Sequence, residues 1–182
     1  MLAYYVAQNG TKSGWHPISI VVHQKGSQAR FRNGFFFSTD RSAPSARQEI
    51  ALALGSPLDF TGLPLSMMWS GQNPGKLPGQ VRAQFDLVMP ANFASVDESE
   101  RNHMIVDIAA VAKDSNGNIF ANLSQRIDDH LKPEGLEQIR THGMTYRNGL
   151  QLPPGDYVVR FVVRDALGNR MGSLIANIKV KL

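Results

Sequence analysis

The chain has 182 residues, 42% of them hydrophobic and 19% charged, which is enough to bury a core and excludes a disordered tail. It contains no cysteine, which excludes disulfides, thiolate metal sites and cysteine nucleophiles. The net charge of +4 arises within residues 1–50, but the basic residues there are spread out, and we expect no nucleic-acid partner.

Residues 1–38 are predicted to form a three-stranded antiparallel β-segment, the tail of an upstream domain. Sequence alternation and turn signals indicate strands over residues 2–7, 15–23 and 29–37. Three short strands need a further apolar surface, so we expect this segment to dock on the rest of the chain or to form a homodimer through its edge strands.

Residues 39–62 are predicted to be a helical connector. Ser42 or Ser45 can cap a short helix over residues 46–54, and Gly55 can end it. The remaining residues, 63–182, are predicted to form an immunoglobulin-like or fibronectin-III-like β-sandwich of about seven strands, so the fold class is mainly β.

The strands of this sandwich are expected over residues 63–69, 80–89, 104–112, 118–127, 144–152, 157–165 and 173–182. Residues 71–79 are expected to be a loop and residues 133–141 one or two helical turns. The last two strands alternate apolar and polar side chains, which indicates an antiparallel sheet with one face in water. We expect one core between two sheets that contains Phe85, Leu87, Val159, Phe161, Leu174 and Ile178.

The densest polar cluster is Asp128-Asp129-His130, which could bind a divalent ion or act in acid–base catalysis. Neighbouring residues on a strand point to opposite faces, so a solvated strand end is the favoured interpretation. Asp114-Ser115-Asn116-Gly117 faintly resembles a calcium loop but lacks the closing glutamate, which favours a hairpin turn. Phosphate-loop and nucleophile-elbow motifs are absent, so we expect no catalytic residue, no cofactor, no metal site and no enzyme activity.

Four aromatic residues, Tyr4, Tyr5, Trp15 and Trp69, are candidates for a partner-binding or sugar-stacking platform. The alternative is that they pack in the core or between domains. Tyr157 follows Pro153-Pro154-Gly155-Asp156 and is predicted to be a corner tyrosine, whose hydroxyl bonds to nearby backbone.

Several blocks occur in an order that resembles the C-terminal region of bacterial von Willebrand factor type A-related proteins. They are Tyr4-Tyr5-Val6, residues 15–22, residues 30–36, residues 56–65, and the stretch from Leu152 to Tyr157. The metal-binding Asp-x-Ser-x-Ser loop of the type A domain is missing, so metal-dependent adhesion is not implied. The resemblance implies an exported bacterial protein, whether periplasmic, cell-surface or secreted.

Two functions are compatible with these patterns. The first is a non-catalytic accessory module that contacts a protein partner or the upstream domain of the same polypeptide. The alternative is a carbohydrate-binding or carbohydrate-active β-sandwich, which two or three coplanar exposed aromatic rings on one face would favour. No membrane span is expected, because charged residues interrupt the longest apolar runs.

Overall fold

The computed structural model describes residues 14–19, 21, 23, 34–37 and 45–181, in two compact units, Met1–Pro44 and Ser45–Leu182. In the first unit β1 (Gly14–Pro17) pairs antiparallel with β2 (Gly34–Phe37). β1 ends at Pro17, earlier than the strand predicted over residues 15–23, because proline has no N–H to donate to a ladder. The strand predicted over residues 2–7 lies outside the described residues.

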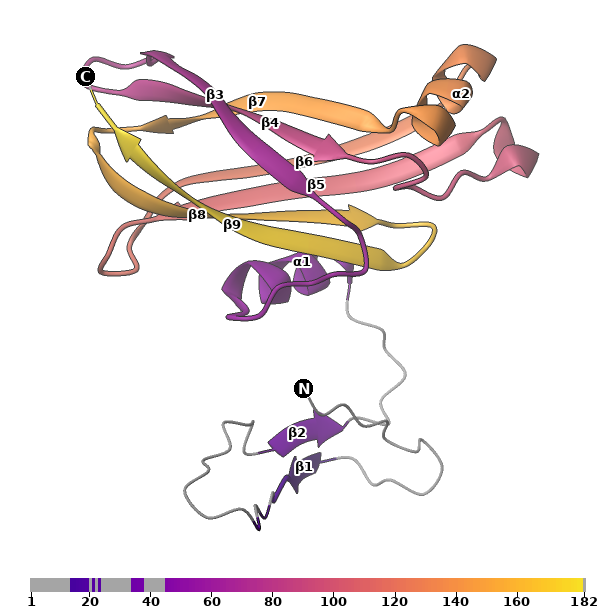
Figure 1. Cartoon of the computed structure of the whole chain (residues 1–182), viewed down its shortest axis with the longest axis horizontal. Coiled ribbons are helices and arrows are strands. Elements are labelled where there is room, and N and C mark those ends of the chain that lie inside the picture. The colour runs from indigo at the N-terminus through magenta and orange to yellow at the C-terminus, as the bar shows by residue number, and fades with distance from the viewer. Residues whose placement is uncertain (1–13, 20, 22, 24–33, 38–44, 182) are drawn as a thin grey trace. The chain divides into compact units, whose positions relative to one another are not determined.

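The second unit is a β-sandwich of seven antiparallel strands in two sheets (Figure 1), which confirms the predicted sandwich and the mainly β fold class. One sheet has three strands in the order β3-β4-β7, and the other has four in the order β6-β5-β8-β9. Their bounds are β3 (Ser66–Pro74), β4 (Val81–Met89), β5 (His103–Lys113), β6 (Ile119–His130), β7 (Met144–Leu152), β8 (Gly155–Asp165) and β9 (Arg170–Val180).

The connectivity differs in one respect from the constant-type immunoglobulin arrangement. There the fourth strand joins the sheet of the first, second and fifth strands. Here the fourth strand, β6, forms a hairpin with β5 and remains in the larger sheet. The chain therefore changes sheets between β4 and β5, between β6 and β7, and between β7 and β8.

β3 extends further than the sequence predicts. The ladder with β4 shifts register between Trp69 and Gly71, and pairing then resumes through Pro74, within the range expected to be a loop. A bulge of this kind breaks the two-residue period on which the prediction depends. Gly71 lies opposite Gln84, where a Cβ atom would come within 3.2 Å of the Gln84 side-chain oxygen.

Two α-helices accompany the strands. α1 (Ala46–Gly55) begins with a capping box in which Ser45 accepts a hydrogen bond from the Gln48 N–H and the Gln48 side chain accepts one from the Ser45 N–H. α2 (Pro133–Thr141) has the predicted bounds, and a short 3-10 helix, η1 (Glu98–Glu100), precedes β5. In the part of the chain that the structure describes, no helix is long and apolar enough to cross a membrane.

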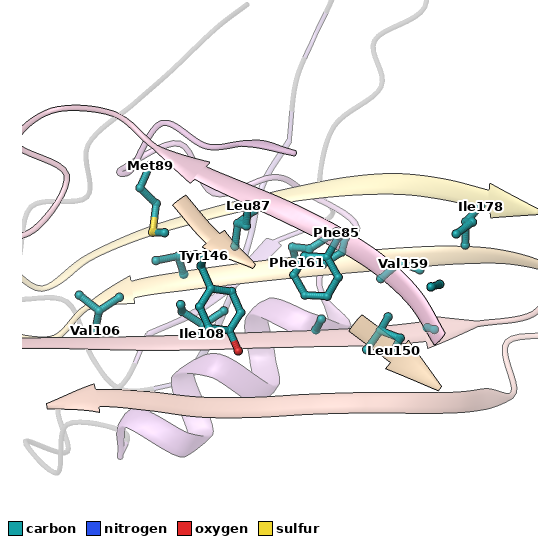
Figure 2. Close-up of a cluster of buried hydrophobic side chains, with 14 of the residues drawn as sticks. Phe85, Leu87, Met89, Val106, Ile108, Tyr146, Leu150, Val159, Phe161 and Ile178 are labelled. Atoms are coloured by element: carbon teal, nitrogen blue, oxygen red, sulfur yellow. The ribbon is translucent and has the colours of Figure 1, made fainter. Parts of the chain in front are cut away.

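The core lies between the two sheets and is centred on a pair of phenylalanines. The ring centroids of Phe85 and Phe161 are 4.8 Å apart at 64° (Figure 2). Of the six predicted core residues Leu174 is half-buried against the core, and the others are buried, as expected: Phe85, Leu87, Val159, Phe161 and Ile178.

The corner tyrosine is also as predicted. Tyr157 stands near the start of β8, and its hydroxyl donates to the Pro153 carbonyl oxygen at 3.1 Å. Its ring is buried among the core residues and meets the exposed ring of Phe120 edge to face. Burial raises the pKa of the Tyr157 hydroxyl above its usual value. The Pro-Pro-Gly corner is therefore tied to the strand that it introduces.

One prediction about the larger sheet is wrong. Its outer face was expected to be in water, yet several residues on that face are buried, because α1 lies over β5 and β8 (Figure 1). The period-two pattern assigns side chains to a face correctly but does not reveal that a helix covers that face. The buried residues of the outer face are Asp107, Ala109, Val111, Arg160, Val162 and Ser173.

Replacing Phe161 with alanine should lower the free energy of unfolding by roughly 3–5 kcal/mol, because a buried ring is replaced by a cavity. Phe161 is 0% exposed and also contacts Trp69, with ring centroids 6.0 Å apart. Val158→Ala, at an exposed position on the outer face of the same strand, is the matched control and should change stability little. A denaturant titration measures both, and a loss below about 1 kcal/mol for Phe161→Ala would contradict the core assignment.

Candidate interaction surface

Helix α1 is attached to the outer face of the larger sheet by polar contacts as well as by apolar packing. Among its residues only Ala53 is buried, and this small side chain offers little apolar area. The helix nevertheless lies across β5 and β8. Hydrogen bonds from two arginines of β8 supply the polar part of the attachment.

The first of these arginines, Arg160, is buried beneath the C-terminal end of α1. Its Nε donates to the Ala53 carbonyl oxygen at 2.8 Å, and its Nη2 donates to the Leu58 carbonyl oxygen and, at 3.0 Å, to Ser173 Oγ. Asp59 Oδ1 lies 3.3 Å from the same Nη2. The last carbonyls of a helix lack donors within the helix and carry partial negative charge. A guanidinium supplies both a hydrogen-bond donor and a compensating positive charge.

The second arginine, Arg164, belongs to a row of alternating charges across the sheet. Its Nε lies 2.7 Å from Glu49 Oε2 on α1, and its Nη1 lies 3.6 Å from Asp107 Oδ2 on β5. Asp107 also accepts two hydrogen bonds from Arg126 of β6, at 2.7 and 3.1 Å. The row therefore links α1 to three strands, and each buried charge in it has an opposite neighbour.

The segment that follows α1 runs along the free edge of β9. The Ser173 N–H donates to the Phe60 carbonyl at 2.9 Å, and the Phe60 N–H donates to Ser173 Oγ at 2.8 Å. The Leu63 N–H donates to the Met171 carbonyl at 3.1 Å, and Thr61 forms an isolated bridge with Gly172. A Cβ atom at Gly172 would lie 2.2 Å from the Leu63 carbonyl oxygen, so only glycine permits this close approach.

Exposed apolar side chains gather on this side of the sandwich, which we call the α1 face: α1, residues 56–62 and the outer face of the sheet β6-β5-β8-β9. Between 38% and 68% of each of these side chains is exposed. Contiguous apolar exposure of this kind is typical of surfaces that bind another molecule. The residues are Leu52, Leu58, Phe60, Ile119, Val158 and Ile175.

Two hollows flank the C-terminal end of α1 within this face. One, of about 390 Å³, lies between the helix and strands β5 and β6, where Ile50 and Ile119 line it. The other, of about 160 Å³, lies over Val158 and Ile175 of β8 and β9. Leu54 and Lys113 line both hollows, so the helix end separates two neighbouring apolar depressions.

The outer face of the smaller sheet is different in character. Arg147 forms a bidentate ion pair with Asp86, with Nε 2.8 Å from Oδ1 and Nη2 2.6 Å from Oδ2. This pair lowers the pKa of the Asp86 carboxyl. Asn73 Nδ2 donates to Gln84 Oε1 at 2.8 Å on the same face. Polar groups that bond to one another lie on this face beside one exposed apolar side chain, Met68, whereas six exposed apolar side chains lie on the α1 face.

The cluster Asp128-Asp129-His130 lies at the C-terminal end of β6, and its three side chains do not converge. Asp128 Oδ1 lies 2.8 Å from His103 Nε2 on β5, whereas Asp129 Oδ1 accepts from the His130 N–H. The strand-end interpretation matches this arrangement. Within residues 45–181 and the short described stretches before them, no three His, Asp or Glu side chains are placed to hold a metal ion.

His103 is a polar residue of this region that the sequence did not single out. The register of β5 and β6 places it opposite His130, and the two rings stack with centroids 4.6 Å apart. The hydrogen bond with Asp128 raises the pKa of His103, and Glu100, 3.3 Å from Nδ1, adds to the effect. A β-bulge between Ala112 and Lys113 shifts the register, so counting residues back from the turn would not have given this pair.

The predicted turn at Asp114 forms the β5–β6 hairpin. The Asp114 carboxylate accepts hydrogen bonds from the Asn116 and Asn118 N–H groups and from the Asn118 side chain. These bonds lower the pKa of Asp114. The carboxylate therefore holds the turn, the role that the sequence favours over calcium binding.

Of the four candidate aromatic residues, the structure describes the side chain of Trp69 alone. Its ring contacts Phe85 and Phe161, and its Nε1 donates to the Asn177 carbonyl at 2.9 Å, so it packs at the border of the core. Trp15 lies on β1 opposite Phe36, and Tyr4 and Tyr5 fall outside the described residues.

Comparison with known proteins adds little to this description. No protein-family model matches the chain, and no curated protein matches its sequence. Among solved structures, a β-glucuronidase from Bacteroides uniformis has a TM-score of 0.39 and 8% sequence identity. The match covers 65% of this chain but 13% of that one, so the chain corresponds to a small part of the enzyme's length.

Replacing Arg160 with methionine should destabilise the attachment of α1 by roughly 1–3 kcal/mol, because the Ala53 and Leu58 carbonyls each lose a charged donor and keep only their bonds from Ser56. Amide hydrogen exchange should accelerate first in α1 and in residues 56–63. Lys179→Met, which removes an exposed cation from β9, is the control and should leave α1 exchange unchanged. Equal exchange of α1 in both variants would show that Arg160 does not hold the helix.

The raised pKa of His103 predicts a pH-dependent contribution to stability. Because the folded state favours protonated His103, its contribution is complete below the unfolded value near 6.5 and is lost as pH rises through the folded pKa. Asp128→Asn should lower the His103 pKa, measured by NMR titration of the imidazole, and flatten the stability profile above pH 6.5. An unchanged His103 titration in Asp128→Asn would contradict the assignment.

Proposed function

We propose that this chain is a non-catalytic interaction module that uses the α1 face to contact a protein partner or an upstream domain of the same polypeptide. The observation that carries the proposal is the gathering of six exposed apolar side chains on one side of the sandwich. The opposite side presents polar groups that are already bonded to one another and one exposed apolar side chain, Met68.

The composition of the α1 face fits a protein contact. Protein interfaces combine an apolar centre with a polar rim. Here Leu58 and Ile175 lie among the apolar side chains, while Arg47 and Lys113 border the hollow between α1 and the sheet. The Arg160 bonds hold α1 in place, so Leu52 and Leu58 stay displayed on a fixed support.

The proposal extends to the setting of the chain. The sequence blocks that resemble von Willebrand factor type A-related proteins support an exported bacterial protein in which this chain follows a type A domain. One of these blocks, Leu152 to Tyr157, contains the corner that introduces β8. In that setting the module would be an accessory contact domain, because the metal loop belongs to the domain that precedes it.

The alternative, a carbohydrate-binding sandwich, has less support. Sugar binding by stacking needs exposed rings in one plane. Within residues 45–181, Trp69 is packed inward, and the exposed aromatic rings are Phe60, beside Ser173, and Phe120, beside Tyr157. Ser173 and Ile178, the partner of Tyr157, are five positions apart on β9, about 17 Å along the strand.

A photo-reactive amino acid in place of Ile175 tests whether the α1 face contacts a protein in cells that produce the chain. Irradiation should give discrete protein adducts, and Leu58→Asp in the same chain should abolish them, because it puts a charge among the exposed apolar side chains. Thr145, exposed on the smaller sheet, is the control position and should give none. Identical adducts from both positions, or saturable glycan binding by the purified chain without adducts at Ile175, would favour the alternative.

A further inference from the structure

The two long sides of the sandwich are closed to different degrees. On the β3–β9 side, Trp69 Nε1 donates to the Asn177 carbonyl, Gln72 Nε2 donates to the Lys179 carbonyl, and the Lys181 N–H donates to Gln72 Oε1. Residues 60–63 cover the rest of the β9 edge. On the other side, where β6 lies near β7, the Tyr146 hydroxyl donates to Gln125 Oε1 at 2.6 Å.

The backbone of β6 presents a row of unused hydrogen-bonding groups. The Leu131 N–H donates to the Asn102 carbonyl, so residue 131 is bonded to its opposite residue next to the β5–β6 ladder. Every second residue of β6 counted back from Leu131 is therefore also bonded to β5. In an antiparallel ladder alternate residues bond to the neighbouring strand, and the residues between them point their N–H and C=O groups away. Since β6 pairs with β5 alone among the described strands, the outward-pointing residues are Asn122, Ser124, Arg126 and Asp128.

This edge has few of the features that normally prevent strand addition, since its one bulge, at Phe120, lies at the start of β6 and leaves residues 121–130 regular. Charged side chains, prolines and bulges protect most exposed edges. β6 has 12 residues without proline or glycine, and residues 119–125 carry no charge. Two of its charges are already engaged within the chain, since Arg126 is bonded to Asp107 and Asp128 to His103, and the third, Asp129, lies near the end of the strand. A second strand would therefore meet free backbone groups and little electrostatic opposition.

We propose that β6 pairs antiparallel with β6 of a second copy of this chain, about a two-fold axis at Gln125. This register joins the strands over nearly their whole length and brings their outward-pointing residues together as hydrogen-bonded pairs. It sets Leu123 opposite Ile127 of the second copy and Ser124 opposite Arg126. No charged side chain then faces a like charge, whereas an axis at Arg126 would oppose two arginines.

The pairing has a direct consequence for the α1 face. A two-fold axis between antiparallel strands is perpendicular to the sheet, so the two larger sheets join into one, with both α1 helices on the same side. The dimer would then present two α1 faces to one partner assembly, which strengthens weak contacts through effective concentration. The dimer itself does not depend on what the α1 face binds.

Ser124→Pro tests the proposal on the full chain. Proline removes an N–H that the monomer does not use, so the fold should survive while the edge loses a donor. By light scattering, the 20.1 kDa chain should approach twice its mass with increasing concentration, while Ser124→Pro stays monomeric and Ser124→Thr dimerises. A chain that is monomeric up to its solubility limit, or a Ser124→Pro variant that dimerises equally, would overturn the proposal.

A cysteine cross-link tests the register and does not depend on the proline variant. The chain has no cysteine, so a single Gln125→Cys gives an unambiguous readout. At a non-hydrogen-bonded antiparallel pair the Cα atoms are about 4.5 Å apart, which a disulfide can span.

Oxidation of Gln125→Cys should therefore give covalent dimers, whereas Asn122→Cys should not, because the two copies of residue 122 lie about 20 Å apart in this register. Equal cross-linking of both variants would rule out the register. The adducts expected at Ile175 should persist in Ser124→Pro, so this proposal and the proposed function fail separately.

Discussion

The arrangement of the second unit depends on one buried cation, Arg160. A guanidinium under a helix would be strongly destabilising without partners, and it finds them in the Ala53 carbonyl near the end of α1 and in the Leu58 carbonyl just beyond the helix. These bonds fix α1 on β8. The position of the helix in turn directs residues 56–63 along β9 and determines which apolar side chains remain exposed.

That path also explains why the sandwich is closed on one side. Residues 60–63 bond to β9 of the larger sheet, and the chain then enters β3 of the smaller sheet. The Trp69 and Gln72 side chains of β3 donate hydrogen bonds to the β9 backbone and connect the two sheets on this side. The opposite side has no equivalent segment among the described residues, which leaves β6 as a long edge with unused backbone groups.

The sequence predicts most strands and both helices because their patterns are local: Tyr157 follows its turn, and Ser45 lies next to the helix that it caps. It does not predict that α1 covers the sheet. Arg160 alternates with apolar residues just as a solvent-facing residue would, and its partners on and just after α1 include two backbone carbonyls, which carry no side-chain signal. The His103–Asp128 contact was missed for a related reason, because it depends on the exact register of two strands.

The position of α1 at the beginning of the second unit also has a mechanical consequence. A pull applied at Ser45 reaches α1 and the Arg160 bonds first, then the few bonds from residues 60–63 to β9, and only afterwards β3. Unwinding a ten-residue helix lengthens the chain from about 1.5 to about 3.3 Å per residue. The segment can thus lengthen under tension and absorb it while the seven strands stay folded.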